Sequence, residues 1–129
     1  MILVLIDADD DCPARLGPEL LRRAQAYRSE TPIGVVIAKS EFEAWFLAAA
    51  RSLAGRRGLT PHLEPPDDPE AIRGAKGWLG RQMVSGHSYS DVIDQPKLAA
   101  VFDQYQARSS PSFDKLWRDL ERLIREVAQ

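Results

Sequence analysis

Four aspartates close together near the start of the chain are the residues with the clearest capacity for chemistry. Asp7, Asp9, Asp10 and Asp11 directly follow the aliphatic run Ile2–Ile6. Carboxylates this close repel one another unless a cation or solvent relieves the repulsion. Aspartates at alternate positions can direct oxygens at one hard cation, and Mg²⁺ typically takes one or two carboxylates together with substrate phosphates. The cluster therefore predicts a Mg²⁺ (or Mn²⁺) site for phosphate chemistry, with a solvated, helix-capping turn as the alternative.

Two apolar runs predict the strands that position these acids. The aliphatic residues of 2–6 are typical of a strand buried on both faces in a parallel α/β sheet, where sites form beyond the carboxyl ends of the strands. A second apolar run at 33–38 predicts another strand. The helix expected over 18–28 connects the two runs, so we expect the strands to be parallel.

The remainder of the chain predicts helices over 40–53, 69–83, 96–107 and 111–127. We therefore expect one α/β domain over 1–129, with a short parallel sheet of about two strands flanked by about five helices. Two strands are few for an independent sheet. We expect that an N-terminal strand is missing upstream of Met1, or that another chain, such as a second copy in a homodimer, completes the sheet.

The composition favours a soluble, cytoplasmic protein. Apolar residues make up 44% of the chain and charged residues 28%, and the net charge is −2. No global basic field attracts nucleic acid or an anionic membrane, so contact with nucleic acid would need a local patch or a partner. The single Cys12 suits a reducing compartment, and no signal or membrane-spanning segment is evident.

A second group of polar residues follows the second predicted strand. Ser40 and Glu43 have the spacing of a capping box at a helix start, which leaves Glu41 as the better candidate for a further acid facing the metal. Lys39, beside this group, and Lys76, in the third predicted helix, are candidates for phosphate contacts. Solvated lysines and a purely structural cap are the alternatives.

The residues 7–11 resemble the Asp-x-Asp-x-Asp element of Toprim domains, which occur in topoisomerases, primases and overcoming-lysogenization-defect nucleases. The chain more closely resembles a family of small bacterial Toprim-like proteins described as a domain of unknown function. The blocks that carry this resemblance are Asp-Ala-Asp-Asp-Asp-Cys-Pro (7–13), Glu-Phe-Glu-Ala-Trp-Phe-Leu-Ala (41–48), Asp-Gln-Pro (94–96) and Ser-Phe-Asp-Lys (112–115). The resemblance implies Asp7 and Asp9 as the main metal ligands, Asp11 as an auxiliary ligand, and an ATPase encoded nearby as a partner.

The chain departs from the Toprim pattern in one respect, and this departure leaves two hypotheses about its function. Toprim domains carry a catalytic Glu after an earlier strand, and no residue here fills that position. One hypothesis is a Mg²⁺-dependent, nuclease-like phosphodiester or phosphoryl-transfer domain with Asp7, Asp9 and Glu41 in catalysis. The alternative is a non-catalytic Toprim-like subunit of an ATPase-associated complex. Haloacid-dehalogenase phosphatases and response-regulator receivers fit less well, because Asp11 replaces the usual Thr or Val of the former and the helical remainder lacks the later strands of the latter.

Overall fold

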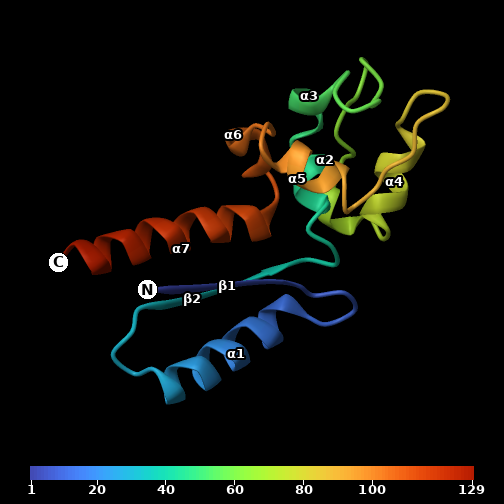
Figure 1. The fold of residues 1–129 in the computed structure, drawn as a ribbon. Coiled ribbons are helices and arrows are strands. Elements are labelled where there is room, and N and C mark those ends of the chain that lie inside the picture. The colour runs from blue at the N-terminus through green and yellow to red at the C-terminus, as the bar shows by residue number, and fades with distance from the viewer.

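The computed structural model describes residues 1–129 and confirms an α/β fold with one sheet of two parallel strands (Figure 1). Strand β1 (Ile2–Asp7) pairs with strand β2 (Ile33–Ala38), in a register that joins Ile2 to Ile33 and Asp7 to Ala38. Helix α1 (Pro13–Tyr27) connects them. Because the strands are parallel, their carboxyl ends meet at one edge of the sheet.

Two long helices cover the two faces of β2. Helix α1 lies on one face, where Ile33, Val35 and Ile37 pack against its apolar residues, and helix α7 (Pro111–Ala128) lies on the other (Figure 1). Gly34 permits the close approach of α7, because a Cβ at this position would lie 3.1 Å from the Cδ1 of Leu123. Strand β2 is consequently buried over its whole length.

The shorter helices gather beyond the carboxyl ends of the strands (Figure 1). They are α2 (Ala44–Ala48), α3 (Ala50–Leu53), the 3₁₀ helix η1 (Pro69–Ala71), α4 (Ala75–Arg81), α5 (Asp94–Ala99) and α6 (Gln104–Ala107). Their apolar side chains form a core that includes the fully buried Phe46, Leu53 and Leu79. This part of the chain therefore forms a compact layer against the end of the sheet. None of the helices has the length and apolar character needed to cross a membrane.

Several predicted helices are wrong in their bounds because local backbone turns interrupt them. Ser40 adopts a φ of 60°, so the helix begins at Ala44 and the predicted capping box does not form. Gly74 has a φ of 69° and separates η1 from α4, where one helix over 69–83 was expected. The expected helix over 96–107 is divided into α5 and α6.

The prediction that β1 is buried on both faces is wrong. Five of its six residues are exposed, and the aliphatic side chains of Ile2, Leu5 and Ile6 each keep close to two fifths of their surface in solvent. The reason is that α1 and α7 both lie over β2, and the sheet has no strand beyond β1. Strand β1 is therefore an open edge strand of strongly apolar sequence.

Candidate functional site

Two tight turns hold the ends of the strands side by side. Asp9, after β1, and Ser40, after β2, both adopt positive φ values of 50° and 60°. The N–H of Asp9 donates to the carbonyl of Ser40 at 2.9 Å, and the N–H of Ala8 donates to the carbonyl of Ala38 at 2.8 Å. Left-handed conformations of residues other than glycine are uncommon and gather at functional sites. These turns bring the predicted acids of both strand ends to one place.

Asp7 is the acid that the protein environment perturbs most clearly among the four aspartates. Its Oδ1 accepts a hydrogen bond from the N–H of Phe42 at 2.9 Å. Partial burial of the carboxyl group raises the pKa of Asp7 above its ordinary value of 3.8, and the charges of Glu43 and Asp9 raise it further. The Phe42 N–H and the charge of Lys76 oppose this shift without cancelling it. The negative charge of Asp7 is therefore under-compensated by the protein itself.

Glu43 is fully buried, and its charge acts on Asp7. Its Oε1 accepts hydrogen bonds from the hydroxyl of Tyr89 at 3.0 Å and from the side-chain amide of Gln95 at 2.8 Å. Its Oε2 is buried without any hydrogen-bond partner. Burial and the Glu43 charge raise the pKa of Tyr89 far above its usual range, so the tyrosine remains a donor. A buried carboxylate oxygen without a partner is costly, and such groups mark functional sites or bound ions.

Glu41 has a different role from Glu43. Its Oε2 accepts a hydrogen bond from the backbone N–H of Lys76 at 3.1 Å, so the carboxylate lies at the start of α4. The Nζ of Lys76 lies 3.3 Å from Asp91, and the charge of Glu43 is the main cause that raises the pKa of this lysine. Lys76 is thus a cation close to the buried acid, and Glu41 is a half-buried acid that is already engaged with the backbone.

The predicted site residues do not all line one hollow. Asp7 and Asp9 line one hollow of about 490 Å³ together with Gln95. Asp9, Glu41 and Arg73 line an adjoining hollow of about 210 Å³. Asp11 lines neither hollow, since its N–H turns back to the carbonyl of Ala8 at 2.8 Å. Lys39 lines a different cavity, which lies between α1 and α7.

These acids fit a magnesium site of low protein coordination. No group of three or more His, Cys, Asp or Glu side chains is close enough together to hold a metal ion. The shared hollow of Asp7 and Asp9 offers two carboxylates, and Mg²⁺ is commonly held by one or two carboxylates with water and phosphate oxygens completing its shell. The arrangement does not fit a closed cage in which Asp7, Asp9 and Asp11 all bind one ion.

Tyr89 and Gln95 were missed by sequence reasoning, and Glu43 was assigned to a cap. Glu43 lies three and four residues before Phe46 and Leu47, which places it on the buried stripe of this segment. That spacing was the signal that could have identified it as a buried acid. Tyr89 and Gln95 lie 46 and 52 residues further along the chain, and only tertiary structure brings them to Glu43.

The fold and the site define a small parallel α/β domain with acids gathered at the carboxyl edge of its sheet. The chain belongs to the family described as Domain of unknown function (DUF4276), whose model matches residues 1–121. No curated protein and no solved structure matches the chain.

Proposed function

We propose that this chain is a Toprim-like domain that binds Mg²⁺ or Mn²⁺ and acts on phosphodiester or phosphoryl groups, in the manner of a nuclease. The observation that carries the proposal is the position of Asp7. This acid lies at the carboxyl end of a parallel strand, where burial, Glu43 and Asp9 all raise its pKa. A divalent cation between Asp7 and Asp9 would relieve this repulsion, and no side-chain cation of the protein pairs with either acid.

The roles of the residues follow from their contacts. Asp7 and Asp9 would hold the ion from the shared hollow, where it would stabilise charge on a transferring phosphate. Glu43 adds negative potential from the protein interior, and Tyr89 and Gln95 fix the orientation of its carboxylate. Glu41 assists from the adjoining hollow, most simply through water, because its Oε2 is occupied by the Lys76 N–H.

Lys76 and Lys39 are the candidates for phosphate contacts, and they lie in different places relative to Asp7 and Asp9. Lys76 is the better placed, because it lies close to Glu43 and Asp91 at the same end of the sheet. Lys39 follows β2 but lines the cavity between α1 and α7. A phosphate contact from Lys39 would therefore require a substrate long enough to reach around the end of β2, as a nucleic-acid strand could.

Calorimetric titration of Mn²⁺ into the purified protein tests the metal site. We expect one bound ion in the wild type and affinity reduced by roughly tenfold or more in Asp7→Asn, since even groups that only orient ligands contribute factors of this size. Asp67→Asn is the matched control, because Asp67 is an exposed aspartate in the loop before η1. Equal affinity in Asp7→Asn and the wild type would contradict the proposal.

A non-catalytic role in an ATPase-associated complex is the second candidate. It is favoured by the absence of a three-acid group and by the open apolar edge of β1, which suits a binding surface. In this case the protein would bind Mn²⁺ without cleaving DNA or RNA, and would co-purify from the cytoplasm with an ATPase encoded nearby. Metal-dependent cleavage that is lost in Asp7→Asn would reject this candidate.

A further inference from the structure

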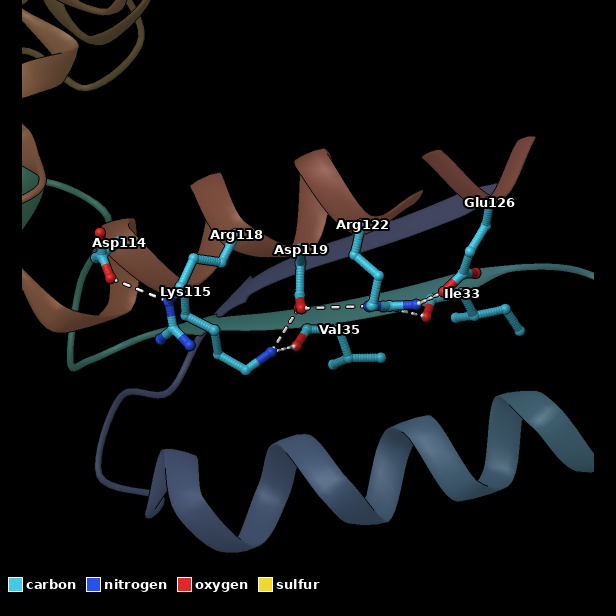
Figure 2. Close-up of polar contacts among 8 residues, drawn as sticks. All are labelled: Ile33, Val35, Asp114, Lys115, Arg118, Asp119, Arg122 and Glu126. Carbon is cyan, nitrogen blue, oxygen red and sulfur yellow. Dashed lines mark hydrogen bonds and ion pairs between the residues drawn. The ribbon is translucent and has the colours of Figure 1, made fainter. Parts of the chain in front are cut away.

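The outer edge of β2 is closed by side chains of α7. Successive residues of β2 direct their backbone groups alternately toward β1 and away from it. The carbonyls of Ile33 and Val35 point away from β1. The Nζ of Lys115 donates to the carbonyl of Val35 at 2.9 Å, and Arg122 donates to the carbonyl of Ile33 at 3.0 Å (Figure 2). Asp119 lies between these cations, 2.6 Å from Lys115 and 3.8 Å from Arg122. Charged side chains over an edge strand prevent it from pairing with another strand.

The outer edge of β1 has no such protection. The same alternation directs the backbone groups of Leu3 and Leu5 outward, where the sheet has no further strand. The aliphatic side chains on both faces of this strand are exposed, among them Ile2 at 40%, Leu5 at 40% and Ile6 at 38%. No charged side chain interrupts the strand before Asp7. An edge of this kind is a template for an added strand.

An apolar groove continues this edge over the face that carries α7. It has a volume of about 480 Å³, and nine of its eleven lining residues are hydrophobic. Leu5 of β1 forms one wall, and Leu116, Leu120 and Ile124 form a ridge along α7 at the other. Because Leu5 belongs both to the edge and to the groove, the two features form one continuous surface. A partner that covers this surface must carry an apolar strand to pair with β1. It must also carry an apolar helix ridge on the same face of that strand to fill the groove.

We infer that this surface binds a second copy of the chain through antiparallel pairing of the two β1 strands about a two-fold axis perpendicular to the sheet. The chain itself carries the required strand and ridge, so an isologous contact covers both features at once. A continuous sheet of four strands results, with the two α7 helices on the same face and their apolar ridges directed toward one another. The inference does not depend on the proposed function.

Charge selects the antiparallel arrangement. Parallel pairing would bring the acids of 7–11 from both copies to the same place, whereas antiparallel pairing separates them by about 20 Å, the length of a six-residue strand. β1 and the groove supply 16 residues per copy with an apolar centre, because Leu5 belongs to both, and flanking residues complete the roughly 20–30 residues per partner of a standard interface.

Sedimentation equilibrium at tens of micromolar protein tests the inference. We expect the wild type to have twice the monomer mass of 14.4 kDa. Leu5→Lys should weaken the dimer at least tenfold, because it places charges in the groove and at the pairing edge. Val84→Lys is the matched control, since Val84 has a similar exposure of 43% in a loop away from β1 and should leave the dimer intact. If Leu5→Lys fails to fold by circular dichroism, Ile124→Lys, at 57% exposure on the α7 ridge that lines the groove, replaces it.

Two results would overturn the inference. One is a wild-type protein that remains a monomer over this concentration range, which would leave the β1 edge to a strand of a different protein or to solvent. The other is a dimer that persists unchanged in a folded Leu5→Lys or Ile124→Lys variant, which would place the interface on another face.

Discussion

The acids of α7 and the acids at the carboxyl edge of the sheet have opposite electrostatic surroundings. Asp114 accepts from Arg108 at 2.8 Å and from Arg118 at 3.0 Å, and the Arg108 hydrogen bond is the main cause that lowers the pKa of Asp114. Asp7, at the sheet edge, has a pKa that is raised by burial and by neighbouring acids. Of the four aspartates there, Asp10 alone has an ion-pair partner, the exposed Arg73 at 3.6 Å.

This difference indicates which acids serve the fold and which are held for another purpose. Carboxylates of α7 such as Asp114, Asp119 and Glu126 have a lysine or arginine partner. Two of these cations, Lys115 and Arg122, also close the edge of β2 (Figure 2). At the sheet edge the charges of Asp9 and Glu43 both raise the pKa of Asp7, and the opposing charge of Lys76 does not cancel them. Uncompensated charge of this kind weakens a fold, and under the proposed function a divalent cation would compensate it.

The largest expected effect concerns the buried acid. Glu43→Ala removes the acceptor of Tyr89 and Gln95 and leaves a cavity, so the free energy of unfolding should fall by about 2–4 kcal/mol. Urea unfolding measures this change. Glu64→Ala is the control, because Glu64 forms only an exposed ion pair with Arg51 and its loss should change stability by less than about 1 kcal/mol. Equal effects of the two substitutions would remove the distinction between buried and surface acids.

A smaller effect is expected from the raised pKa of Asp7. Between its ordinary pKa of 3.8 and the raised value, the folded protein holds the proton more tightly than the unfolded chain does. Stability therefore falls as the pH rises through this window. Asp7→Asn should remove this part of the pH dependence and raise the thermal midpoint at neutral pH in metal-free buffer. Thermal melts of both proteins from pH 3 to pH 8 measure it, and a destabilised Asp7→Asn at neutral pH would contradict the raised pKa.

The same melts should show the opposite slope, with a smaller amplitude, for an acid of α7. The pKa of Asp114 is lowered, so its stabilising contribution is present above the ordinary value of 3.8 and is lost as the pH falls through the lowered pKa. Asp114→Asn should therefore lower the thermal midpoint slightly at neutral pH and match the wild type in strong acid. A difference that grows toward acid pH would show that the arginines do not stabilise this carboxylate.

The sequence predicted the strands and their parallel pairing because these depend on uninterrupted apolar runs. The expected runs 2–6 and 33–38 differ from the observed strands by no more than one residue. The predicted helix start at 69 is also observed, where η1 begins and the side chain of Asp68 accepts from the N–H of Glu70 at 3.2 Å. Both features are set by residues close together in the chain, where periodicity and capping chemistry act.

The rest depended on contacts between distant segments. The spacing of Ser40 and Glu43 favoured a capping box, but a positive φ at Ser40 and the distant partners of Glu43 override that local preference. The aliphatic composition of β1 favoured a buried strand, whereas its burial is decided by which strand α1 and α7 cover. Neither outcome is encoded within a short window of sequence. The resemblance to Toprim domains remains a prediction.

The most direct test of the central claim is the position of Mn²⁺ in a crystal of the wild-type protein, located by its anomalous scattering. We expect one strong peak in the hollow that Asp7 and Asp9 share, with a carboxylate oxygen of at least one of them as a ligand at about the 2.0–2.2 Å typical of small divalent ions. The peak should be absent from Asp7→Asn crystals grown in the same conditions. A wild-type crystal with no peak at this edge, or with a peak bound only by Asp10 and Asp11, would rule out a metal site at Asp7 and Asp9.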